Sequence, residues 1–168
     1  DKLDAVWYSA STSDGTRGIN SGGGPGGAGS RIEYFNISVT SNAIDFGDLS
    51  AARQGVGMSS DGIKGITIGG HPSSDVMEYF TINTLGNAVD FAEFSVSGQV
   101  VFGSVADGSR GIFNKSQEIY YMTIGTLSGA SGFGEFSLSC YGGSGMSNGS
   151  RCCWQLDVPP AGTNNIDY

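Results

Sequence analysis

Residues that could carry chemistry are few in this sequence of 168 residues. The single histidine, His71, has no second histidine with which to form a metal cluster, and the sequence indicates no catalytic triad around it. Paired carboxylates, which glycosidases use, occur as Asp45 with Asp48 and as Asp90 with Glu93. Because the pair recurs at equivalent positions, it favours a structural role in turns over catalysis. We therefore expect a non-enzymatic protein with no catalytic residues, no metal site and no cofactor.

The cysteines allow one disulfide. Three are present, Cys140, Cys152 and Cys153, and all lie near the end of the sequence. Counting outward from the turn at Asn148-Gly149, Cys140 and Cys153 would face each other across a hairpin, so a bond between them is geometrically possible. Free buried thiols are an equal alternative, because cysteine packs as a small hydrophobic residue.

The sequence is organised as a repeat. A turn recurs at steps of 47, 46 and 41 residues (61 − 14, 107 − 61, 148 − 107), at Asp14-Gly15, Asp61-Gly62, Asp107-Gly108 and Asn148-Gly149. Such pairs favour tight hairpins, because glycine adopts positive φ without a steric penalty. A strand with aromatic residues follows each of these turns, the last at Ile166-Asp167-Tyr168. In the first three repeats a further strand follows it and carries Phe46, Phe91 or Phe133. We expect these three phenylalanines to be buried between sheets.

A unit of this length with four short strands is typical of a propeller blade. The sequence therefore predicts one all-β domain, a kelch-like β-propeller of about four four-stranded antiparallel blades. Its repeats cover about residues 5–49, 54–95, 98–138 and 140–168, the last completed by residues 1–3. In the second repeat the strands are expected near 54–60, 65–70, 76–83 and 88–95.

This organisation predicts that the two ends of the chain lie in the same blade or at one shared seam, within one sheet's width of each other. The four turns should gather on one face. The alternatives are a three-repeat fragment that packs against a partner chain, and a solenoid built from similar repeats. The segments between second and third strands, where the glycine-rich run NSGGGPGGAGS lies, would form a variable rim on the opposite side. The candidate binding residues of this rim are Gly24, Pro25, His71, Pro72, Asn114 and Lys115.

Two resemblances follow from these motifs. Arg53 before a small first strand, Gly69-Gly70 closing the second and Glu78-Tyr79 in the third resemble the kelch type of propeller, without its usual fourth-strand tryptophan. The segments TSNAIDFGDLSAARQGVGMSSDG and TLGNAVDFAEFS resemble the TGNATDFGDL repeats of virion structural and tail proteins of cyanophages and other marine phages. The third repeat departs from the pattern at Gly132. The second resemblance implies a virion or tail accessory role and no particular reaction.

Charge and hydropathy narrow the function further. The net charge of −8 argues against binding to a phosphate backbone, and no apolar run of 18 residues predicts a membrane span. We expect an extracellular virion component, in a tail fibre, tail tip or capsid surface, with other virion proteins or copies of itself as partners. The alternative is a lectin-like receptor-binding module for host-surface glycans, in which Tyr34, Tyr79 and Tyr121 would stack on sugars. The pattern of these tyrosines favours core positions over stacking. A polysaccharide-active enzyme is the third candidate.

Overall fold

The structure is a computed structural model that describes residues 2–3, 5–24, 29–72, 75–94, 101, 103–140, 142–157 and 165–167. In these ranges the chain consists of strands and turns with almost no helix. The described strands form four antiparallel sheets, three with four strands and one with three. The prediction of an all-β protein built from four-stranded antiparallel units is therefore confirmed at this level.

The sheets follow the repeat order of the sequence. The first contains β1 (Ala10–Ser13), β2 (Arg17–Ser21), β3 (Arg31–Asn36) and β4 (Ile44–Asp48). The second contains β5 (Gly57–Ser60), β6 (Lys64–Ile68), β7 (Val76–Thr81) and β8 (Val89–Glu93). The third contains β9 (Gly103–Ala106), β10 (Arg110–Lys115), β11 (Glu118–Thr123) and β12 (Ser131–Glu135). The fourth contains β13 (Gly142–Ser147), β14 (Cys152–Asp157) and β15 (Asn165–Asp167).

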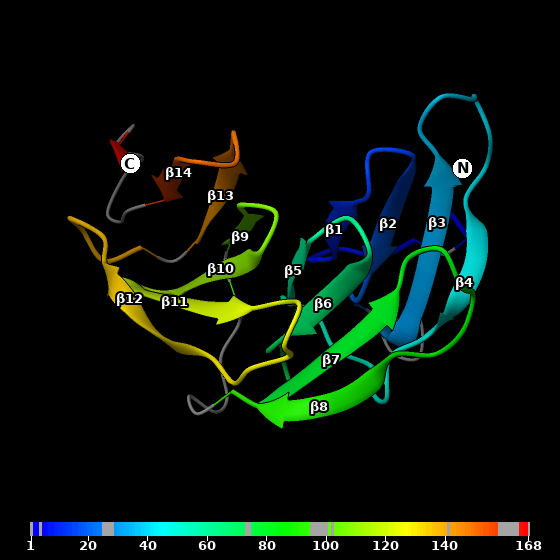
Figure 1. Ribbon diagram of the computed structural model, residues 1–168, viewed down its shortest axis with the longest axis horizontal. Coiled ribbons are helices and arrows are strands. Elements are labelled where there is room, and N and C mark those ends of the chain that lie inside the picture. Colours follow the sequence, from blue (N-terminus) through cyan, green and yellow to red (C-terminus); the bar gives the residue numbers. More distant parts are fainter. Residues whose placement is uncertain are drawn as a thin grey trace.

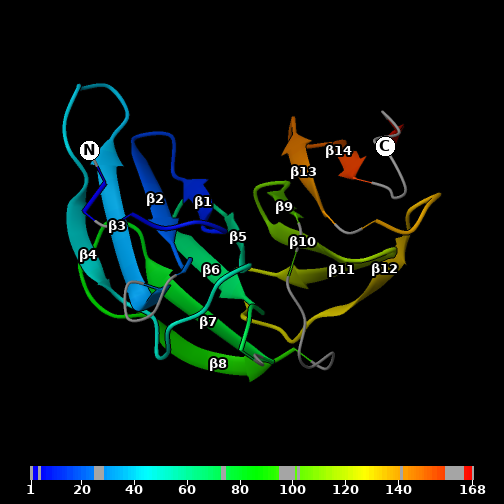
Figure 2. The ribbon, with the colours of Figure 1, turned by 180° about the vertical axis from the view of Figure 1, so that it is seen from behind.

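The first strand of each sheet lies inside an arc and the last strand lies outside it (Figure 1, Figure 2). Hydroxyl groups link neighbouring inner strands: Ser59 Oγ donates to the carbonyl of Val105 (2.8 Å), and Ser104 Oγ donates to that of Met58 (2.6 Å). Glycine also allows close approach, because a Cβ on Gly57 would lie 2.5 Å from a methyl group of Val101. The small residues of the first strands therefore set how closely the sheets meet.

The turn between the first and second strands has the same geometry in all four sheets of the described chain. In the first, Asp14 Oδ1 accepts hydrogen bonds from the amides of Thr16 and Arg17 (2.7 and 2.6 Å), and Gly15 has a φ of +88°. The matching bonds are made by Asp61, Asp107 and Asn148. Residues that end the inner strands, Ser13, Ser60, Ala106 and Ser147, line one cavity of about 250 Å³. The turns thus gather at one end of the inner strands, as the sequence predicts.

The described residues form no closed ring, so the prediction that the two ends of the chain share a blade or a seam is not confirmed. Residues 2–3 and strand β15 lie on opposite sides of the arc (Figure 1). The amide of Leu3 donates to Glu33 Oε1 of β3 (3.1 Å), and Lys2 Nζ donates to Asn20 Oδ1 of β2 (2.6 Å). The amide of Ser50, in the segment that leads into the second sheet, makes the equivalent bond to Glu78. Residues 2–3 therefore belong to the segment that leads into the first sheet.

The fourth strands carry their phenylalanines at equivalent bulges, but the burial differs. Each ring makes an edge contact with a third-strand tyrosine at 6.0–6.2 Å, in the pairs Tyr34–Phe46, Tyr79–Phe91 and Tyr121–Phe133. Phe46 is 3% exposed because it also packs on Phe80 of the next sheet, at 5.3 Å. Phe133 is 54% exposed, and Phe91 is half-buried. The expectation that all three are buried is therefore wrong. Phe133 lacks such a partner among the described residues, where β15 ends at Asp167.

A buried ion pair fixes the junction between the first and second sheets. Arg53 lies in the segment that joins β4 to β5, and its guanidinium forms a salt bridge with Glu78 of β7. The guanidinium also donates to the carbonyls of Gly69 (3.0 Å) and Val76 (3.2 Å). Burial lowers the pKa of Arg53 to about 10, which leaves it protonated at neutral pH.

The first sheet keeps the carboxylate of this pair and lacks its arginine. Glu33, the equivalent of Glu78, is 4% exposed, and its Oε2 has no hydrogen-bond partner among the described residues. The position equivalent to Arg53 is held by Val6, which lies 47 residues earlier (53 − 6), the same step that separates the first two turns.

Phe46→Ala is expected to lower the free energy of unfolding by about 3–5 kcal/mol, because it opens a cavity between two sheets. The matched change Phe133→Ala should cost less than about 1 kcal/mol, since that ring is largely exposed. Urea denaturation of both variants measures the difference. Equal costs would show that the two bulges have the same surroundings, contrary to the structure.

Arg53→Val is expected to cost about 3–5 kcal/mol, because it leaves the carboxylate of Glu78 buried without a partner. Val6→Arg is the converse change, and it should raise the stability by giving Glu33 the guanidinium that Glu78 has. Thermal unfolding of the two variants tests both signs. A Val6→Arg variant less stable than the parent chain would contradict the equivalence of the two junctions.

The Asp107 turn is expected to weaken in acid. Burial acts to raise the pKa of Asp107, but hydrogen bonds from the amides and side chains of Arg110 and Ser109 outweigh it and hold the value at about 2. Its contribution to stability is thus present above about pH 4, the range of an unfolded aspartate, and is lost as the pH falls toward 2. Asp107→Asn keeps the acceptor, as Asn148 does, and should flatten the stability profile between these values in denaturation experiments. An unchanged profile would show that Asp107 is not responsible.

Candidate functional site

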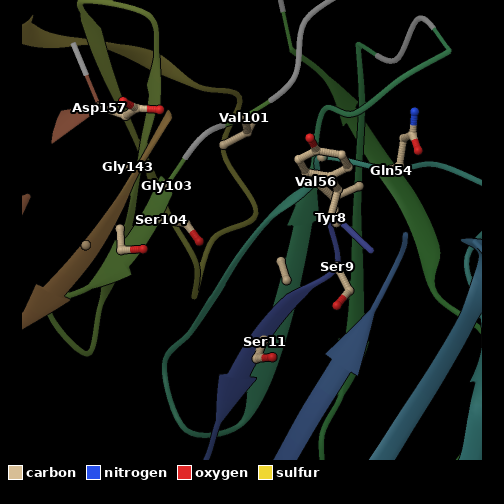
Figure 3. Close-up of a pocket in the computed structure, with 14 residues that line it drawn as sticks. Tyr8, Ser9, Ser11, Gln54, Val56, Val101, Gly103, Ser104, Gly143 and Asp157 are labelled. Atoms are coloured by element: carbon tan, nitrogen blue, oxygen red, sulfur yellow. The ribbon is translucent and has the colours of Figure 1, made fainter. Parts of the chain in front are cut away.

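A cavity of about 650 Å³ opens at the other end of the inner strands. Strands far apart in the sequence supply its walls (Figure 3). Tyr8 and Gln54 lie on one side, and Ser104 and Asp157 lie on the other. The full lining is Tyr8, Ser9, Ala10, Ser11, Gln54, Gly55, Val56, Val101, Gly103, Ser104, Gly143, Ser144, Gly145 and Asp157. Hydroxyl groups, one amide and one carboxylate thus line a space bounded mostly by small residues, which suits a ligand with several hydrogen-bonding groups.

Tyr8 stands out in this lining because its backbone is strained. It has a φ of +57°, where side chains other than glycine are uncommon, and its side chain is 71% exposed. The equivalent position in the second sheet is Gly55, with a φ of +67°, whose amide donates to the carbonyl of Tyr8 (2.8 Å). The first two sheets therefore share a left-handed backbone at this point, and an exposed aromatic ring is kept there at an energetic cost. Strain of this kind is concentrated at functional sites.

The predicted rim residues of the first two sheets lie close to this cavity. Gly24 exchanges backbone hydrogen bonds with Trp7, which precedes Tyr8 (3.1 and 2.9 Å). His71 exchanges them with Gln54, which lines the cavity (3.1 and 2.8 Å). His71 and the adjacent Pro72 are exposed, whereas Gly24 is buried. Pro25 lies outside the described residues.

The rim prediction for the third sheet needs correction. Asn114 and Lys115 belong to β10, which continues to Lys115 and leaves a shorter loop than the sequence suggested. Asn114 is 1% exposed, with its Nδ2 near the carbonyl of Ser116 (3.4 Å). It pairs across the ladder with Gly103, which lines the cavity, so it supports the cavity wall from behind. Lys115 is half-buried at the end of the strand.

The predicted pairing of Cys140 with Cys153 is not found. None of the three cysteines takes part in a disulfide in the structure. Cys153 lies opposite Met146 in the hairpin, whereas Cys140 precedes β13 and donates to the carbonyl of Ser116 (3.1 Å). Strand β13 begins after Cys140, so counting out from the turn placed Cys140 wrongly in it. The pKa of Cys152 is raised, chiefly by burial.

The tyrosines proposed for sugar stacking are half-buried. Tyr34, Tyr79 and Tyr121 pack edge-on against the fourth-strand phenylalanines, as described above. Tyr8 was not predicted as a site residue, because no aromatic residue stands at the equivalent position of the second repeat. The available signal was the glycine at the equivalent Gly55, a residue type that favours a left-handed backbone.

Among the described residues, no group of three or more histidine, cysteine, aspartate or glutamate side chains could hold a metal ion. In the same part of the chain no helix is long and apolar enough to cross a membrane. No protein-family model matches the sequence, and no curated protein shows significant similarity to it.

Tyr8→Gly is expected to raise the free energy of unfolding by about 1 kcal/mol, because glycine relieves the left-handed strain. Tyr8→Ala is the matched control, since it removes the ring and keeps the strain, and it should bring no such gain. Urea denaturation of the two variants makes the comparison. A Tyr8→Gly variant no more stable than Tyr8→Ala would mean that Tyr8 is unstrained in solution.

Proposed function

We propose that this chain is a non-enzymatic virion structural protein, a component of a tail fibre, a tail tip or the capsid surface, with a propeller-type architecture. The observation that carries the proposal is the radial order of the four described sheets, each with its first strand inside the arc. That order supports the blade interpretation of the repeats. The virion role itself rests on the resemblance of segments 40–62 and 84–95 to repeats of marine phage proteins.

The surface of the chain suits a role in assembly. Its two edge sheets expose apolar side chains whose equivalents elsewhere in the chain are covered. Phe35 of the first sheet is 42% exposed, whereas its counterpart Phe80 is 2% exposed beneath the first sheet. Such faces pack against other sheets, so other virion proteins or further copies of the chain are the partners proposed.

Antibodies raised against the purified chain test this proposal. They should label intact particles in immunogold electron microscopy, and mass spectrometry should find the chain at a fixed ratio to the other particle proteins. Detection in infected cells but not in purified particles would refute the virion role. Turnover of a polysaccharide by the purified chain would refute the non-enzymatic assignment.

The cavity favours a second candidate, the binding of a host-surface glycan. An exposed tyrosine beside serine hydroxyls, the Gln54 amide and the Asp157 carboxylate is a suitable set for stacking on a sugar and bonding its hydroxyl groups. Receptor recognition would then take place at the axis of the arc and not at the half-buried tyrosines.

A glycan array with the parent chain, Tyr8→Ala and Phe35→Ala separates the two candidates. Glycan binding predicts a signal that Tyr8→Ala abolishes and that Phe35→Ala, a change at an exposed ring outside the cavity, leaves intact. Silence of the parent chain across bacterial surface sugars would eliminate the second candidate and leave the structural role.

A further inference from the structure

The fourth turn opens on an amide where the other three turns open on a carboxylate. Aspartate holds this place in the first three turns, at Asp14, Asp61 and Asp107. Asn148 holds it in the fourth and is followed by Gly149, which makes the only asparagine–glycine pair in the sequence. The backbone nitrogen after an asparagine can attack its side-chain amide, and glycine hinders this attack least because it has no Cβ. The fourth turn is therefore a candidate site of deamidation.

The turn that holds this pair projects into solvent. All five of its residues are exposed: Ser147, Asn148, Gly149, Ser150 and Arg151. A Cβ on Gly149 would have no atom of the described chain within 4 Å, apart from its immediate chain neighbours. The side chain of Asn148 bonds within the turn, where Oδ1 accepts from the amides of Ser150 (3.0 Å) and Arg151 (2.9 Å). Exposed turns open locally at little free-energy cost, and the attack on the side chain needs only such an opening.

The third turn shows that an aspartate fits this position without rearrangement. Asp107 Oδ1 accepts hydrogen bonds from the amides of Ser109 (2.9 Å) and Arg110 (2.7 Å). Asn148 Oδ1 accepts the matching pair in the fourth turn. Arg110 Nε also forms a salt bridge with Asp107 Oδ2 (2.8 Å). Because Arg151 is the equivalent of Arg110, an aspartate in the fourth turn would give the guanidinium of Arg151 a carboxylate partner.

We propose that Asn148 is a site of spontaneous deamidation, at which the fourth turn is converted into the aspartate form that the other three turns already have. The backbone nitrogen of Gly149 loses its proton and bonds to Cγ of Asn148, and the bond from Cγ to Nδ2 breaks with release of ammonia. Water then opens the resulting succinimide ring. Cleavage between this nitrogen and Cγ leaves aspartate, whereas cleavage between the nitrogen and the main-chain carbonyl carbon leaves isoaspartate. Water is the only other reactant.

The two products act on the hairpin in opposite directions. Aspartate keeps the acceptor of the turn and adds a negative charge, so that the four described turns carry four carboxylates in place of three. Isoaspartate inserts an additional carbon into the main chain, and the pairing of Ser147 with Cys152 that closes the hairpin then loses its register. The aspartate product should therefore stabilise the turn, and the isoaspartate product should weaken it.

Ageing of the purified full chain at mildly alkaline pH, continued until a urea-unfolded sample has reacted, tests the reaction. Peptide mass spectrometry should find Asn148 converted in the folded chain at no less than about a tenth of its rate in the unfolded chain, since the turn opens easily. Asn87 is the internal control and should stay intact, because it is also exposed but is followed by alanine. Conversion of Asn148 in the unfolded chain alone, or equal conversion of Asn87, would overturn the proposal.

Asn148→Asp tests whether the turn accepts the product. The amide and guanidinium donors favour the charged form of a carboxylate at this position, so the variant should have a higher urea midpoint than the parent chain at neutral pH. This gain should persist down to about pH 4, the range of an unfolded aspartate, and be lost as the pH falls further. Asn87→Asp, which adds the same charge outside the turns, is the matched control and should bring no such gain. A variant at Asn148 no more stable than the parent, or an equal gain from Asn87→Asp, would overturn the proposal.

Discussion

Every sheet in this chain has two apolar faces, and both need to be covered by a neighbour. Equivalent positions show the effect: Phe35, with no sheet in front of it in the described structure, is partly exposed, whereas Phe80 is buried under the first sheet. The same rule separates the buried Phe46 from the exposed Phe133. The sheets therefore depend on one another as the units of repeat proteins do.

The arc follows from the strands nearest its axis. Glycine and serine in β1, β5, β9 and β13 allow close approach and supply hydroxyl bridges between neighbouring sheets, while the repeated turn ends each inner strand in the same way. The same small residues leave a hydroxyl-lined cavity at the opposite end. Close packing of the inner strands thus leaves a candidate binding site at the axis. Tyr8 adds an exposed ring to this site, at a backbone conformation that glycine adopts in the second sheet at Gly55.

The sequence predicts the repeat well because its signals are local. The Asp-Gly turns and alternating strands require only neighbouring residues, and the strands of the second repeat lie where they were expected, with β6 ending before the positive φ of Gly69. The expectations that failed concern relations between distant units. Burial of Phe133 depends on which sheet lies next in space, whereas Cys140 was misplaced because β13 begins after it. The buried salt bridge between Arg53 and Glu78 was likewise not predicted, although both residues belong to the motif that resembles kelch repeats.

The central claim is that the inner strands of the four described sheets surround one axis. A nitroxide on Ser13→Cys, with the native cysteines changed to serine, tests it by paramagnetic relaxation in NMR. Ser13 lines the same cavity as Ala106 and Ser147. The account predicts strong broadening of the amide signals of both residues, even though Ser147 lies in the fourth sheet. Broadening confined to the second sheet, with Ser147 unaffected, would indicate a linear stack and contradict the radial arrangement.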